Sequence, residues 1–137
     1  MAQTGWVMGI PFLRMMIHEA EPVAIEQVLD HFDHVVRLVG VEHLAVGSDM
    51  DVVGNPNPVN GPTQSVPATP NFERYRLHQD AAGNRLMTIA GLDHPKRSYD
   101  LAEGLIRRRY TDEHIRLILG GNAARVFAAI WVGGSRP

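Results

Sequence analysis

The sequence contains no cysteine, which excludes a disulfide framework and any metal site built on thiolates. It has little net charge as well: 13 Lys and Arg oppose 15 Asp and Glu, so a formal charge of −2 gives no electrostatic reason to expect a nucleic-acid partner. The apolar stretch from Trp6 to Ile17 is interrupted by Pro11 and Arg14 and is too short to cross a bilayer. It lacks the basic region of a signal peptide. These absences predict a cytoplasmic chain without a membrane partner.

Short catalytic motifs are missing too. The sequence has no G-x-S-x-G, no HExxH and no phosphate loop, and it contains no internal repeat. Its 137 residues, 45% hydrophobic and 20% charged, have the ordinary composition of one globular domain with a core. The class of protein must therefore be inferred from the order of its segments.

The first half of the chain has the pattern of a βαβ unit. Two apolar segments, Trp6–Leu13 and Val41–Ser48, predict strands, and the stretch Pro22–Val39 predicts a helix that ends at Gly40. The apolar face of this helix carries Ile25, Val28, Leu29, Phe32, Val35, Val36 and Val39. This order predicts an α/β fold with two neighbouring parallel strands and a right-handed crossover.

A long connection divides the chain. The prolines between Gly54 and Pro70 mark a loop, and we expect residues 54–91 to form a long loop on the active-site side of a single partial domain, 1–137. Helices are then predicted from Ser98, from Thr111 through Leu119, and from Asn122 to about Trp131. The first of these helices has an apolar face of Leu101, Leu105 and Ile106. Thr111 is the predicted N-cap of the second, Gly120–Gly121 breaks it, and Asn122 is the predicted cap of the third.

Asp49 is the leading candidate for chemistry. It follows the apolar run Val41–Ser48, and catalytic residues of β/α barrels lie where such strands end. The alternative is a structural role, in which Asp49 caps the strand end or forms an Asx-turn. Asp51 lies two residues later and can turn toward the same site.

The other polar clusters favour structural roles. His31 and His34 predict a solvated helix face, and roughly 20 Å of strand separates His43 from Asp49, too far for one ion. Asp33 and Arg37 lie four apart and can pair weakly. Structural roles are also expected for Asp93-His94-Pro95 as a helix cap, Arg107-Arg108-Arg109 as a solvated helix end and Gly120-Gly121-Asn122 as a turn and cap. Arg74 and Arg76, in the long loop, are candidates to meet a substrate carboxylate.

In combination, several motifs resemble the membrane dipeptidase family (peptidase family M19, renal dipeptidase-like). DHFDHV at 30–35 and VGVEHLAVGSDMD at 39–51 are similar to its final βαβ unit, and GWVMG at 5–9 to the preceding strand. LDHPKR at 92–97, GLIRRRYTD at 104–112 and GGNAARVF at 120–127 look like the close of bacterial members. The resemblance implies a TIM-type (β/α)8 barrel with two zinc ions, which hydrolyses dipeptides. Asp49 then matches the catalytic aspartate, a general acid–base.

The resemblance also implies that the metal ligands and most of the barrel are absent from this chain. The family's metal ligands lie upstream of the equivalent of Gly5, so no residue here is assigned as a metal ligand, and a barrel typically needs about 250 residues. The chain is therefore expected to be the C-terminal sector of a zinc-dependent dipeptidase, inactive alone, with a dipeptide substrate and either a homo-oligomer or the missing N-terminal barrel half as partner. The alternative is a non-catalytic module that docks onto another polypeptide.

Overall fold

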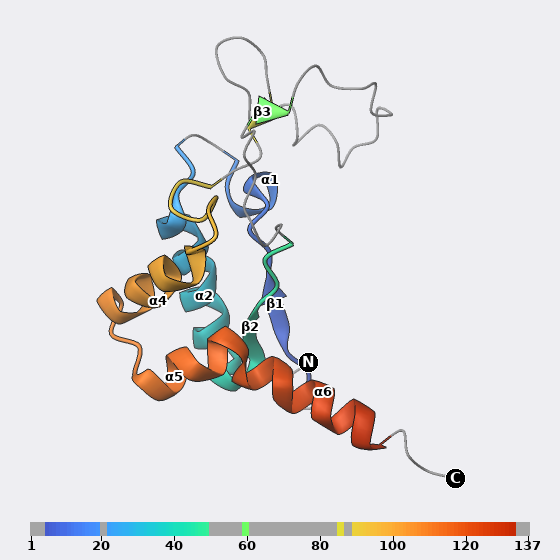
Figure 1. Cartoon of the computed structure of the whole chain (residues 1–137). Coiled ribbons are helices and arrows are strands. Elements are labelled where there is room, and N and C mark those ends of the chain that lie inside the picture. Colours follow the sequence, from blue (N-terminus) through green and yellow to red (C-terminus); the bar gives the residue numbers. More distant parts are fainter. Residues whose placement is uncertain (1–4, 20–21, 50–58, 61–84, 87–88, 134–137) are drawn as a thin grey trace.

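Two parallel strands joined by a long helix form the centre of the computed structural model, which describes residues 5–19, 22–49, 59–60, 85–86 and 89–133. Strand β1 (Met8–Ile10) pairs with β2 (Leu44–Val46) in the register Met8↔Leu44 to Ile10↔Val46. Helix α2 (Ile25–Val39) makes the crossover (Figure 1). The predicted α/β fold and the parallel pair are confirmed.

Both strands are shorter than the apolar segments that predicted them. Pro11 has no N–H to donate, and β1 ends at the residue before it. The pairing nevertheless continues, because Gly47 N donates to Ile10 O at 3.1 Å and Phe12 N donates to Ser48 O at 2.9 Å. Beyond the first predicted segment, residues 14–17 form a short helix, α1 (Arg14–Ile17), which the sequence did not predict. At the start of the second predicted strand, a 3₁₀ turn (Val41–His43) leads into β2.

Helix α2 presents its predicted apolar face to the core. It begins at Ile25, so the prediction of Pro22 in its first turn is wrong: the start is fixed by the Ala24 N–H, which donates to Gln27 Oε1 at 2.8 Å. Gly40 ends the helix as predicted, with a φ of 94° that favours glycine. The fully buried side chains packed between α2, the strands and the later helices are Phe12, Val23, Val28, Leu29, Phe32, Leu44, Ile89, Leu92, Leu101, Leu105 and Ile118.

Three further helices surround this unit. Helix α4 (Arg97–Arg107) packs against α2 on the side away from the strands, and α5 (Asp112–Arg116) and α6 (Asn122–Gly133) follow (Figure 1). The Thr111 cap is confirmed, because its Oγ1 accepts from His114 N at 3.2 Å. Ile106 is 59% exposed, so its placement on the apolar face was wrong.

The predicted break at Gly120–Gly121 is a kink rather than a loop. Residues Leu117–Gly121 form a π-helical segment in which Gly120 departs from helical geometry, so α5 and α6 are joined without a turn. Asn122 has the backbone angles of a helix interior, φ −67° and ψ −44°, and is therefore not the cap that the sequence predicted.

Little of the long loop is described. Within 54–91 a two-residue strand β3 (Val59–Asn60) pairs antiparallel with β4 (Arg85–Leu86), and Ile89 returns to the core. The remaining residues of the predicted loop, 54–58, 61–84 and 87–88, lie outside the described residues. In the part of the chain that is described, no helix is long and apolar enough to span a membrane.

Candidate functional site

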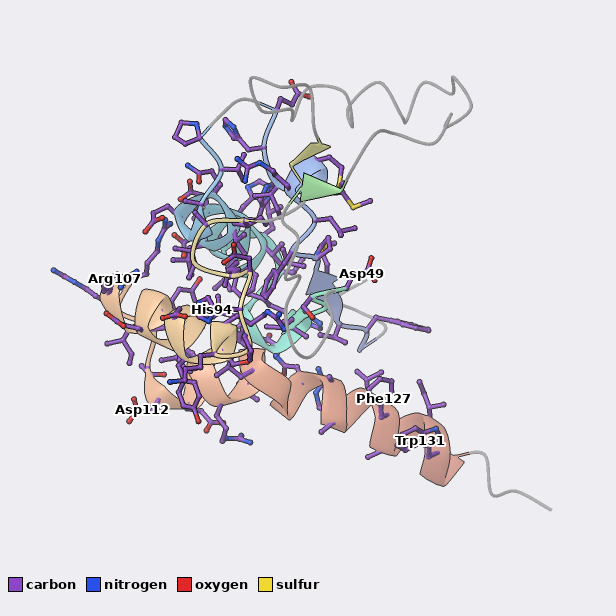
Figure 2. The ribbon with its side chains drawn as sticks, turned by 45° about the horizontal axis from the view of Figure 1, so that its top comes forward. Asp49, His94, Arg107, Asp112, Phe127 and Trp131 are labelled. Carbon is purple, nitrogen blue, oxygen red and sulfur yellow. The ribbon has the colours of Figure 1, made fainter. Side chains whose placement is uncertain are left out.

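Asp49 projects from the carboxyl end of β2, where its side chain is exposed (Figure 2). Its φ of 52° lies in the left-handed region, which Asp tolerates better than most residues. The chain therefore changes direction at Asp49 directly after the last inter-strand hydrogen bond, that of Ser48 O. A carboxylate in this place is accessible to a ligand, and a paired strand fixes its backbone up to the preceding residue.

A close approach of the two backbones underlies this strand end. A Cβ added at Gly47 would lie 3.2 Å from Gly9 Cα, and one added at Gly9 would lie 3.1 Å from Gly47 Cα. Such contacts are tighter than ordinary van der Waals packing, so glycine at both positions lets the strands meet just before Asp49.

Asn122 ties β2 to the last helix, a role that the sequence did not reveal. Its amide Nδ2 donates to Val41 O at 2.7 Å and to Leu44 O at 2.8 Å, and the residue is fully buried. Buried amides are usually retained for such bonds. Only its place after Gly120–Gly121 singled it out in the sequence, and its partners lie about 80 residues away, so no local signal could identify them.

Arg125 holds the opposite, amino end of the strands. It donates to Gly5 O at 3.1 Å and to Glu42 O at 2.7 Å. A cavity of about 320 Å³ lies beside it, lined in part by Trp6 and Ile130. Because this end faces away from Asp49, we assign Arg125 to stability rather than chemistry.

Two histidines of the first half, His31 and His43, make structural contacts. His31 is half-buried and its Nε2 lies 2.7 Å from Ile17 O, so the prediction of a solvated face is wrong for His31, although His34 is exposed. His43 Nδ1 lies 2.8 Å from Trp6 O. Within the described ranges, no group of three or more His, Cys, Asp or Glu is placed to hold a metal ion.

His94 supports the start of α4. Its Nδ1 accepts from Lys96 N at 3.2 Å, and its Nε2 lies 2.9 Å from Asp100 Oδ2. The N-cap of α4 is Lys96 and has no side-chain cap, so the predicted cap role of Asp93-His94-Pro95 is wrong, although the contacts of His94 are structural.

Arg108 links α2 to the end of α4. The prediction that Arg107-Arg108-Arg109 form a solvated helix end is therefore wrong for Arg108. Its Nη1 donates to Asp30 and Asp33 at 2.6 Å each, and its Nη2 donates to Glu26 O at 3.1 Å. Asp33 is thus bound by Arg108 rather than by the predicted Arg37. Burial lowers the pKa of Arg108, but the hydrogen bonds and charges of Asp33 and Asp30 together raise it.

Tyr110 completes this network, since its hydroxyl donates to Asp33 Oδ1 at 2.8 Å. Burial, and then the hydrogen bond and charge of Asp33, raise the pKa of Tyr110 well above its ordinary value of 10.0. A raised pKa favours the neutral phenol in the folded state. The resulting stability is fully present below pH 10 and is lost as the pH rises above it.

Replacing Tyr110 by phenylalanine tests this network. At pH 7 the Tyr110→Phe variant should lose about 1–2 kcal/mol of unfolding free energy, because a hydrogen bond to a carboxylate is removed. Above about pH 10 the difference from the original chain should shrink, since only the original chain then loses stability from Tyr110. Urea unfolding at both pH values measures this. Tyr99→Phe is the control, because Tyr99 is 77% exposed; a difference that does not change with pH would contradict the account.

Three predicted site residues, Asp51, Arg74 and Arg76, lie outside the described residues. Their roles therefore stay predictions, and Asp49 is the member of the predicted set whose surroundings are described.

Comparisons with known proteins agree with the motifs. Residues 1–64, just under half of the 137-residue chain, match the family model "Membrane dipeptidase (Peptidase family M19)". The chain is 27% identical over 126 residues to dipeptidase verJ of Clonostachys rogersoniana, covering 92% of this chain and 24% of that protein. It is 29% identical over 92 residues to dipeptidase tcpJ of Claviceps purpurea (strain 20.1), covering 66% and 21%.

A solved structure shares the fold. An amidohydrolase from Pseudomonas aeruginosa matches with a TM-score of 0.66 at 18% identity, over 95% of this chain and 38% of that one. The chain spans about a quarter or less of the length of the two dipeptidases. The predicted resemblance to the membrane dipeptidase family, peptidase family M19, is confirmed.

Proposed function

We propose that this chain forms the last βαβ unit and the closing helices of a zinc-dependent dipeptidase barrel and supplies its general acid–base carboxylate, Asp49. The position of Asp49 carries the proposal: it is exposed at the carboxyl end of β2, directly after a parallel pair. In β/α barrels the catalytic groups come from this end of the strands. The dipeptidase relatives and the fold shared with an amidohydrolase support the assignment.

Asp49 would move a proton between water and the leaving group. As a carboxylate it accepts a proton from the attacking water, and as a carboxylic acid it then donates that proton to the amine of the departing amino acid. An exposed side chain on a strand-anchored backbone suits this exchange, because the group must reach the substrate while its backbone stays fixed.

The described residues do not provide a zinc site. No step at a metal is therefore assigned to this chain, and we propose that the zinc ligands come from the upstream part of the barrel. The long loop 54–91, which contains Arg74 and Arg76, and the preceding Asp51 are proposed to lie on the substrate side. A cytoplasmic location stays a prediction.

A chimera tests the proposal. Residues 5–137 are joined to the upstream part of a dipeptidase relative, and zinc content and hydrolysis of a simple dipeptide are measured. Hydrolysis supports the proposal. A folded, zinc-loaded chimera without turnover would contradict it.

The second candidate function is a non-catalytic module that docks onto another polypeptide. Large apolar side chains at the surface favour it: Trp6 is 58%, Leu38 68% and Trp131 73% exposed, and Trp131 stacks on the half-exposed Phe127 at 5.4 Å between ring centroids (Figure 2). Exposed apolar patches of this kind mark surfaces that bind another chain.

Both candidates lead us to expect self-association of the purified chain. The described two-stranded parallel sheet has open edges, and sheets of this size are weak without further cover. Sedimentation velocity over a range of concentrations should show species larger than a monomer. A monomer at every concentration, with a sharp melting transition, would show that these surfaces need no partner.

A further inference from the structure

A small cavity lies between the carboxyl end of the strands and the first turn of α4. It measures about 140 Å³, several times the ~30 Å³ that one water occupies in the liquid. Phe12, Val46 and Leu101 form apolar walls, and Ser48, Arg97 and Ser98 are its polar lining. In Figure 2 His94 marks the loop that enters α4 and Asp49 the end of β2.

Arg97 is the unusual member of this lining. It is only 8% exposed, and its Nε donates to Leu92 O at 2.9 Å, whereas its buried Nη2 has no acceptor. Among the described residues no carboxylate forms an ion pair with it; the neighbouring Asp100 lies against His94 instead. A guanidinium stays charged in proteins, and a buried charge without a partner is costly. Within the described residues, the guanidinium therefore lacks a countercharge.

The start of α4 adds to the positive potential. Arg97 and Ser98 are the first two residues of an eleven-residue helix, whose dipole favours anions at this end. The N–H groups of Arg97 and Tyr99 already donate to His94 O and Lys96 O, so the helix contributes its dipole rather than these two donors. The hydroxyls of Ser48 and Ser98 are further donors. Proteins bind oxyanions with guanidinium groups, hydroxyls and helix starts, and this cavity has all three around it.

We propose that this cavity binds a small oxyanion, a phosphate or a carboxylate. The guanidinium of Arg97 supplies the charge, and Ser48 and Ser98 supply hydrogen bonds. The proposal does not depend on dipeptidase activity, since it rests on the charge and the cavity alone.

Calorimetric titration of the full chain tests the site, with inorganic phosphate in one arm and acetate in the other, at chloride-matched ionic strength. We expect saturable binding of one anion per chain in at least one arm, and the arm that binds identifies the class. Arg97→Gln should raise Kd about tenfold or more, because hydrogen bonds from a charged group are lost. Arg107→Gln is the matched control: its side chain is 53% exposed at the other end of α4, and it should leave Kd unchanged.

A Ser48→Val variant keeps the test decisive if Arg97→Gln does not fold, because it removes one hydroxyl and adds a methyl group to the cavity wall. It too should weaken binding while Arg107→Gln does not. The absence of saturable binding in both arms by the original chain would overturn the proposal. So would an equal loss of affinity in the Arg97 and Arg107 variants, which would indicate non-specific attraction.

Discussion

Replacing Asp49 by asparagine in the dipeptidase chimera is expected to lower the turnover number about 10²–10⁴-fold, the usual contribution of a general acid–base. The amide has nearly the shape of the carboxylate but cannot carry a proton between water and the leaving amine. Zinc content and the melting temperature should stay close to those of the chimera with Asp49, because the exposed side chain contributes little packing.

The matched control is Asp51→Asn. Asp51 lies two residues beyond the strand end, where we predict a smaller effect on turnover at saturating substrate. If Asp49 only caps the strand end, Asp49→Asn should instead cost roughly 1 kcal/mol of stability with turnover nearly unchanged. That outcome would remove the one catalytic role that we propose for this chain.

Replacing Phe32 by alanine should have the largest effect on folding. Phe32 is fully buried in α2, within the core that joins the strands to α4. Loss of such a side chain typically costs about 3–5 kcal/mol, a large part of the stability of an ordinary domain. The unfolding midpoint in urea should fall sharply.

Leu38→Ala on the same helix is the control for Phe32→Ala. Leu38 is 68% exposed, so its loss should change stability by about 0.5 kcal/mol or less. Equal effects of the two substitutions would mean that the face of α2 that we place in the core is not the one that packs.

The βαβ unit could be predicted because its signals are local. The apolar face of α2 repeats at helical spacing, Gly40 marks its end, and two apolar segments flank it. Thr111 and the buried Leu101 and Leu105 were predictable for the same reason: a cap or a helix face is determined by neighbours within a few residues.

The contacts that support the site could not be predicted in this way. Asn122 reaches Leu44, and Arg108 reaches Asp30, across more than 70 residues of sequence. The partners of Asn122 and Arg108 cannot be identified from the sequence alone. Asn122 was therefore interpreted as a cap and Arg108 as part of a basic helix end. The burial of Arg97, with an Nη2 that lacks an acceptor among the described residues, depends on the packing of α4 against α2 and has no sequence signal.

We propose that this chain supplies Asp49 and that the upstream part of the barrel supplies the metal ligands. The most direct test is to measure zinc content and dipeptide hydrolysis of the purified chain. We predict no stoichiometric zinc and no turnover for residues 1–137 alone, because the described residues contain no group that could hold the metal. Two tightly bound zinc ions per chain with measurable turnover of a simple dipeptide would contradict it.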